Sequence, residues 1–342
     1  MGRKAAGLII WGLLTSGCHQ VTEFENIGNS RISMVSTLDL QVEAVMVLQC
    51  QGRAVVCPGP GQLVVISSDG TLRRVNTNAM SVDTSYSIGG SSGTGYNDAI
   101  LDNHGDLYVL GPGSQVIEVD LGTNTVEDNF TPGQQPLALS PSPTEEKIYF
   151  ADASDCSIGE VWTYANVNGF RSPMAHQPSD LSVDPEGGRH IVAVTSSDEG
   201  YIYGIWLDLS TTARRLTNAF SGSPCSGVVC FGIDSVYAVS CPQWSSDSGY
   251  VMLVQGFMVP ETSGRCNLPG HPVDMCFIPG ASPEGLLFVM NRTGSGRTVV
   301  SVMEFSEGYL QPRVIAALDV DGFPRDIESS FYGDHLFVLT SD

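Results

Sequence analysis

The chain has 342 residues, 42% of them hydrophobic and 15% charged, which is enough to bury one large repeat domain or two ordinary domains. Gly (38 residues) and Pro (19 residues) are abundant, and this favours many short strands joined by tight turns over long helices. The net charge of −21 repels phosphate backbones, so it argues against nucleic acid as a partner and suits cations or a basic protein.

The N-terminal segment predicts export. Two basic residues precede AAGLIIWGLL, an apolar stretch too short to span a bilayer, and LTSGC then ends at Cys18. This ending resembles the lipobox of bacterial lipoproteins, although Thr15 stands where an aliphatic residue is usual. The resemblance implies a lipid on Cys18 and, because His19 rather than Asp follows, an outer-membrane or cell-surface location facing the periplasm or exterior. An ordinary signal peptide cleaved nearby is the alternative. We expect a signal at 1–17, a lipidated Cys and tether at 18–29 and one domain at 30–342.

From Arg53 onward the sequence repeats with a period of roughly 40–50 residues, which is the range of propeller blades. The clearest cycle, Asn97–Gly133, contains four short segments bounded by turn residues. In the third cycle we expect the second strand at 147–159 and the third at 160–168. The six full cycles that we assign are 54–90, 97–133, 137–177, 180–222, 226–270 and 273–322.

Two half cycles remain at the ends of the sequence. Ser30–Leu38 and Gln41–Gln49 supply two strands, and residues 325–334 and 335–342 supply two more. Pairing these ends would complete a seventh blade and remove the unpaired edges of an open ring. The sequence therefore predicts an all-β, seven-bladed β-propeller of four-stranded antiparallel blades, closed by two strands from each end.

The segment VIEVDLGTNTV (Val116–Val126), together with LYVL and IYFAD, resembles the YVTN/NHL group of seven-bladed propellers. The resemblance extends over essentially the whole chain after the tether. It implies the fold but no single reaction, because that group includes binding scaffolds, lactonases and lyases.

An aspartate recurs where a fourth strand meets the next first strand: Asp98, Asp180, Asp274 and Asp326. Leu137 and about Gly227 take this place in the third and fifth blades, and the first offers no clear match. One interpretation is a ring of oxygen ligands for a hard cation such as Ca²⁺ at one channel mouth. The other is that each carboxylate accepts hydrogen bonds from backbone N–H groups and fixes the connection between blades. The identity of any metal stays unknown.

His176 and His271 belong to the same predicted mouth, beside these acids. A general-base role and an ordinary polar loop are both open for them. Beyond Cys18, eight cysteines form an even set in an exported context, which predicts up to four disulfides. Short separation favours Cys50–Cys57 and Cys266–Cys276, and Cys225, Cys230 and Cys241 share one region. The disulfide candidates are Cys50, Cys57, Cys156, Cys225, Cys230, Cys241, Cys266 and Cys276.

Two functions follow from these patterns. The first is a membrane-anchored, monomeric scaffold that binds a protein, glycan or small ligand at one channel mouth and performs no catalysis. The second is a metal-dependent hydrolase or lyase of the lactonase type that uses the acidic mouth. The sequence contains no nucleophile elbow, P-loop or H-E-x-x-H motif, and this favours the scaffold.

Overall fold

The computed structural model describes residues 29–89, 96–185, 190–195, 200–207, 210–215, 223–231, 236–243, 245–255, 261–279, 285–306 and 311–342. The predicted signal, Cys18 and all of the tether except residue 29 lie outside this part of the chain. Within the described ranges, no helix is long and apolar enough to cross a bilayer.

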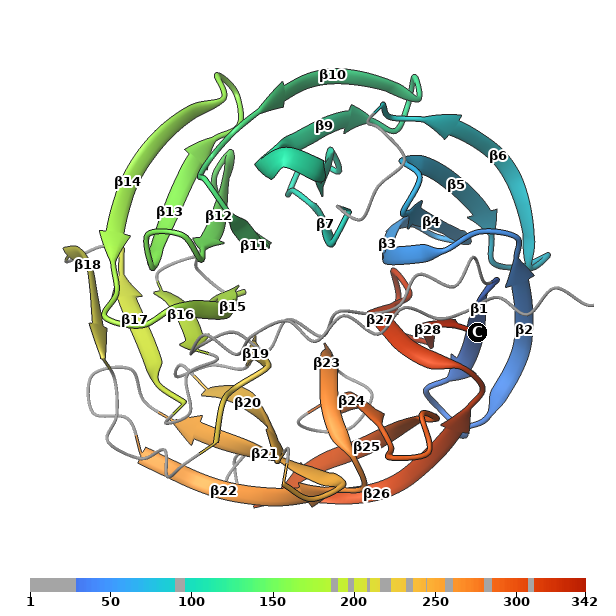
Figure 1. Ribbon diagram of the computed structural model, residues 1–342. Helices are drawn as coiled ribbons and strands as arrows, with labels where there is room; N and C mark the ends of the chain where they lie inside the picture. Colours follow the sequence, from blue (N-terminus) through green and yellow to red (C-terminus); the bar gives the residue numbers. More distant parts are fainter. Residues whose placement is uncertain are drawn as a thin grey trace, which may run out of the picture.

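The described residues form seven four-stranded antiparallel sheets, arranged as blades around a central axis (Figure 1). Blade one contains β3 (Gly52–Gly59), β4 (Gln62–Ser67), β5 (Thr71–Asn76) and β6 (Ser81–Ser87). Blade two contains β7 (Asp98–Leu101), β8 (Leu107–Leu110), the 3-10 turn η1 (Pro112–Ser114), β9 (Val116–Asp120) and β10 (Thr125–Phe130). Blade three contains β11 (Pro136–Pro141), β12 (Lys147–Asp152), β13 (Ser157–Trp162) and β14 (Val167–Pro173).

The next three blades continue in chain order around the ring. Blade four contains β15 (Pro178–Val183), β16 (His190–Thr195), β17 (Ile202–Trp206) and β18 (Ser210–Arg215). Blade five contains β19 (Gly227–Phe231), β20 (Val236–Gln243), β21 (Ser248–Gln255) and β22 (Glu261–Leu268). Blade six contains β23 (His271–Ile278), β24 (Leu286–Arg292), β25 (Thr298–Ser306) and β26 (Gln311–Val320).

Blade seven is built from both ends of the chain, which confirms the predicted closure. Its strand order is β2 (Val42–Leu48), β1 (Ser30–Ser36), β28 (His335–Ser341) and β27 (Phe323–Ser329). Strands β1 and β28 pair antiparallel from Ser30 opposite Ser341 to Ser36 opposite His335. The ion pair between Arg31 and Asp342, with an N–O distance of 2.7 Å, lies at the end of this seam. The ring therefore closes through hydrogen bonds within one sheet.

The core is divided among the junctions between blades. Seven clusters of buried apolar side chains are present, and each joins two neighbouring blades. The second strands are the most buried, as in β12, where all six residues are buried, because blades cover both of their faces. The outermost strands are mostly exposed, as in β6. Strands buried on both faces read as continuous apolar runs, and this is why the repeat is legible in the sequence.

Blade three corrects two details of the sequence-based assignment. Its third strand is β13, which begins at Ser157, because a turn after Asp152 ends β12 earlier than expected. The residue that matches the recurring aspartate is Ala138 and not Leu137, because a bulge after Pro136 shifts the register by one residue.

Candidate functional site

The four recurring aspartates occupy one equivalent position in the innermost strands. Each lies at the point where the first strand begins its regular pairing with the second, as Asp180 does opposite Val194 and Asp274 opposite Met290. Their side chains are partly exposed toward the channel. The charges of Asp98 and Asp274 act on Asp180, so the structure brings these acids into one electrostatic group, as the sequence predicts.

Each of these carboxylates joins its own blade to the next one. One oxygen accepts the N–H of the following residue, for example from Ala99 to Asp98 at 2.8 Å. The other oxygen accepts a backbone N–H from the innermost strand of the next blade. These bonds run from Leu139 to Asp98 (2.7 Å), Val228 to Asp180 (2.8 Å), Ile327 to Asp274 (3.2 Å) and Val55 to Asp326 (2.6 Å). This is the structural interpretation: the carboxylates fasten blades together.

The blades without an aspartate carry a small residue at the same position. These residues are Ala54 in blade one, Ala138 in blade three and Gly227 in blade five. Each immediately precedes a residue whose N–H is bound by the incoming carboxylate. A methyl group placed on Gly227 would lie 3.4 Å from Oδ2 of Asp180, so a long side chain there would displace the Asp180 carboxylate. Aspartates and small residues thus alternate around the ring. The aspartate of one blade extends its carboxylate to the next blade, where the small residue leaves room for it.

Seven is an odd number, so this alternation has to fail at one junction. It fails between blades six and seven, where Asp274 and Asp326 are neighbours and their carboxyl groups hydrogen-bond to each other. A hydrogen bond between two carboxyl groups requires a proton on one of them. Burial, followed by the charge of Asp274, holds the pKa of Asp326 well above its usual range, and burial also raises the pKa of Asp274. The pair therefore shares one proton.

The other channel acids also titrate above their usual range. Burial raises the pKa of Asp98 to about 6 and that of Asp180 to about 8, although backbone hydrogen bonds oppose the shift. Burial, with the charge of Asp274 beside it, raises the pKa of Glu328 in β27 to about 8. These side chains are partly exposed, yet protein atoms surround them, and this enclosure disfavours their charged form.

The same geometry bears on the cation hypothesis. Both oxygens of each recurring aspartate already accept N–H groups, which leaves less of their lone-pair capacity for a cation. In the described part of the chain, no group of three or more His, Cys, Asp or Glu side chains is arranged to hold a metal ion.

The two histidines are held in different blades. The ring of His176 stacks on Tyr201 with centroids 4.0 Å apart, and its Nδ1 lies 2.7 Å from the hydroxyl of Tyr203. His271 begins β23 opposite Arg292 in blade six, with blade five between it and His176. Tyr201 and Tyr203 are both aromatic residues of blade four, and His176 packs against them.

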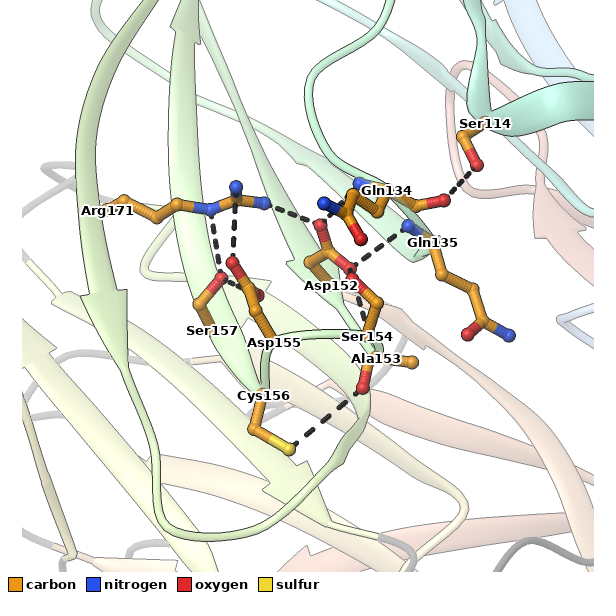
Figure 2. A network of polar contacts seen from close by, with 10 residues as sticks. All are labelled: Ser114, Gln134, Gln135, Asp152, Ala153, Ser154, Asp155, Cys156, Ser157 and Arg171. Carbon is orange, nitrogen blue, oxygen red and sulfur yellow. Dashed lines mark hydrogen bonds and ion pairs between the residues drawn. The ribbon is translucent and has the colours of Figure 1, made fainter.

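Asp152 is a further carboxylate that connects separate segments through hydrogen bonds, and the sequence did not reveal it (Figure 2). This fully buried carboxylate accepts the N–H groups of Gln134 (2.8 Å), Gln135 (3.1 Å) and Ser154 (3.0 Å), the hydroxyl of Ser154 and the guanidinium of Arg171. It thereby ties the end of β12 to the segment arriving from blade two. Burial alone would raise the pKa of Asp152, but these hydrogen bonds outweigh burial and lower it.

The eight described cysteines are thiols in the structure. Cys50 and Cys57 both pack at the junction of blades seven and one. Cys266 and Cys276 pack in different clusters, on the outermost strand of blade five and the innermost strand of blade six. The sulfur atoms of Cys225 and Cys241 lie 3.7 Å apart in the interior of blade five. The structure thus brings together two of the three cysteines that the sequence places in one region.

Comparison with known proteins supports the fold. No family model matches the chain, and no curated protein matches it. Among solved structures, "Structure of U3-55K" is similar with a TM-score of 0.67 and 13% identity, over 85% of this chain and 88% of that one. The hydrazine synthase of Kuenenia stuttgartiensis matches with a TM-score of 0.67 and 15% identity, over 86% and 96%. "Crystal structure of RRP9 WD40 repeats" matches with a TM-score of 0.66 and 11% identity, over 86% and 95%. At these identities the likeness shows a β-propeller and no more.

Proposed function

We propose that this protein is a non-catalytic binding scaffold outside the cytoplasm, a propeller of the YVTN/NHL type tethered to a membrane by a lipid on Cys18. The observation that carries the proposal is the use of the channel acids. Asp98, Asp180 and Asp326 each spend a carboxylate oxygen on the N–H of a neighbouring blade, at 2.6–2.8 Å. The acids on which a lactonase-type mechanism would depend are thus committed to holding the ring rigid.

Rigidity is what a binding scaffold needs, because a preformed surface loses little conformational entropy when its ligand binds. The sequence supports the location: a short apolar segment leads to a lipobox-like ending at Cys18. The net charge of −21 supports a basic protein or a cationic ligand as the bound molecule.

Elemental analysis and thermal melting test the choice between scaffold and metal enzyme. We expect purified protein to contain no stoichiometric divalent metal and to melt at the same temperature in calcium and in chelator. A bound stoichiometric metal that raises the melting temperature would overturn the scaffold in favour of the metal-dependent enzyme.

The anchor is tested separately in a bacterial host, by labelling with a palmitate analogue and by fractionation. We expect the wild type to carry the label and to sediment with membranes, and Cys18→Ser to lose the label. A wild-type chain released without lipid would show an ordinary signal peptide instead.

A further inference from the structure

Exposed apolar side chains gather on blade seven. Thirteen large hydrophobic residues are exposed among the described residues, and seven of them belong to this blade, while no other blade carries more than two. The seven are Leu38, Val42, Val45, Val47, Phe323, Phe331 and Tyr332. Phe323 lies at the far end of β27 from Phe331 and Tyr332, and the other six lie on β2 and the two turns beside it. Clustered apolar exposure marks an interaction site more often than scattered apolar residues do.

Three of these side chains are held together by two clasped turns. The turn between β1 and β2 carries Leu38, which is 94% exposed, and the turn between β27 and β28 carries Phe331 and Tyr332, which are 60% and 73% exposed. The turns are joined through Thr37, whose N–H donates to Asp334 O (3.1 Å) and whose hydroxyl donates to Gly333 O (2.8 Å). The rings of Phe331 and Tyr332 meet edge to face at 5.2 Å. The turns therefore present apolar groups in a fixed arrangement.

Strand β2 extends this patch along an open sheet edge. It pairs with β1 on one side and is the outermost strand of its sheet (Figure 1). The register shift beside Met34 places Val42 on the same face as Val45 and Val47, opposite alternate residues of β1. Outermost strands β6 and β10 carry one exposed large hydrophobic residue each, amid polar neighbours. Edge strands usually carry charges that discourage pairing, and β2 carries Glu43 alone.

The charges around the patch select the partner. Asp39, Glu43 and Asp334 flank it, and His335 lies between Glu43 (3.1 Å) and Asp334 (3.2 Å). A second copy of a chain with a net charge of −21 would be repelled here, and so would anionic lipid headgroups. A basic polypeptide would be attracted.

We propose that the blade-seven surface, defined as Leu38, Val42, Val45, Val47, Phe331 and Tyr332, docks a partner polypeptide in which an extended apolar segment is flanked by Lys or Arg. The proposal rests on the scaffold function and names its site. The extended segment adds to the edge of β2, its apolar side chains cover the valines and the two turns, and its basic residues meet the acidic rim.

A phage-displayed library of random peptides, selected on the purified chain, provides the probe. We expect enriched sequences to combine aliphatic or aromatic residues with Lys or Arg, and to bind in fluorescence anisotropy with an affinity that falls as salt rises. The variant L38S/F331S/Y332S should weaken the best peptide at least tenfold. The matched control Y164S/V167S, which removes exposed side chains from blade three, should change binding less than twofold.

The outcomes separate the site from the function. Peptides that bind equally to the triple variant would overturn the blade-seven site and leave the scaffold function standing. Failure to enrich any peptide would overturn the docking of a polypeptide at blade seven, and the metal and melting measurements above would still decide the scaffold function. Self-association in sedimentation, or binding to phosphatidylglycerol vesicles, that is lost in L38S/F331S/Y332S would show that the occupant is a second copy or a membrane. A second variant, V45T/V47T, keeps β propensity and should also weaken the peptide.

A separate observation concerns the two sulfurs in blade five. Gly227 pairs with Ser240, and the N–H of the preceding Ser226 donates to Ser240 O (2.9 Å), so the chain at Cys225 runs beside Cys241. Both thiols are buried, with sulfurs 3.7 Å apart. We infer that Cys225 and Cys241 form a disulfide when the chain folds in the presence of a disulfide oxidant. Two S–H bonds break, one S–S bond forms, and the two protons and two electrons reduce the oxidant to its dithiol.

Burial fixes when this bond can form. The neighbouring Cys241 sulfur, followed by burial, holds the pKa of the Cys225 thiol well above its usual range, so the folded protein offers little thiolate for exchange. Oxidation therefore accompanies folding and does not follow it.

Refolding in a glutathione redox buffer tests the bond. Chymotrypsin can cut after Phe231 and Tyr237, between the two cysteines, and the background variant Cys230→Ser removes a competing thiol from the first fragment. We expect mass spectrometry to find the Cys225 and Cys241 fragments linked after refolding, and both thiols unalkylated when reagent is added only to folded, reduced protein. Two alkylated thiols after oxidative refolding would overturn the inference.

Discussion

Asp152 holds the connection that enters blade three, and Asp326 ties blade seven to blade one, yet the two acids are held in opposite ways. Asp152 accepts four hydrogen bonds from N–H and hydroxyl groups and one from the Arg171 guanidinium, so its carboxylate stays charged when buried. Asp326 accepts two backbone N–H groups and faces a second acid, Asp274, so this pair keeps a proton. The number of donors and the sign of the neighbour, and not burial itself, decide which form of a buried acid fastens a propeller.

The largest effect is expected from Asp152→Ala. The substitution leaves the N–H groups of Gln134 and Gln135 and the guanidinium of Arg171 without their acceptor. We expect the free energy of unfolding in urea at pH 7 to fall by about 3 kcal/mol. Arg171 is partly exposed and can turn to water, so Arg171→Gln should cost less. Equal losses for the two variants would show that the ion pair, and not the backbone donors, dominates this junction.

A second acid introduced at the junction of blades two and three should reproduce the acid pair found between blades six and seven. Ala138 lies where Asp98 fastens blade two to blade three, so Ala138→Asp creates a second pair of neighbouring acids. We expect a loss of about 2 kcal/mol at pH 8 and a smaller loss at pH 5, where one acid can be protonated. Ala138→Ser adds a side chain of similar reach without charge and should show no such pH dependence. A loss for Ala138→Asp that is the same at both pH values would contradict the alternation.

The two regions should also respond to pH in opposite directions. The folded pKa values of the channel acids are raised, so the stability they contribute is complete below their unfolded pKa of about 4 and is lost as pH rises, toward about 6 for Asp98 and about 8 for Asp180. The folded pKa of Asp152 is lowered, so its contribution is present above about pH 4 and is lost as pH falls below that. Urea titrations should therefore show maximum stability near about pH 4, with the free energy of unfolding falling on both sides.

Asp326→Asn isolates the paired junction in that profile. The amide can donate a hydrogen bond to Asp274 without a titrating proton. The free energy of unfolding of the variant should therefore exceed that of the wild type by about 1 kcal/mol at pH 8, which corresponds to less than one pKa unit. Asp98→Asn is the control, because Ala138 beside it offers no carboxylate to accept the amide N–H, and it should be destabilised at every pH. If both variants behave alike, Asp274 and Asp326 do not share a proton.

The sequence predicts the ring well because strands buried on both faces are continuous in apolar character, and because the two leftover halves at the ends complement each other. It reveals the recurring aspartates but not their partners, since the bound N–H groups lie 41 to 53 residues further along or, at the closure, 271 residues back. One signal was available. Pro136, Pro178, Pro272 and Pro324 each stand two residues before the key position, and alignment on proline finds Ala138. Asp152 has no such signal, because its donors come from three separate segments.

The smallest effect is expected from Ser154→Ala, which tests how evenly the hydrogen-bond donors around Asp152 contribute to the free energy of unfolding. The hydroxyl of Ser154 is one of five donors, and the backbone N–H of the same residue stays in place at 3.0 Å. Loss of the hydroxyl should lower the free energy of unfolding by about 0.5 kcal/mol at pH 7. It should also raise the pKa of Asp152, because one hydrogen bond that favours the charged form is gone. The loss of stability at low pH should then begin at a slightly higher pH. A loss as large as that of Asp152→Ala would mean that the network acts as a single unit, in which case removing any one donor releases the carboxylate.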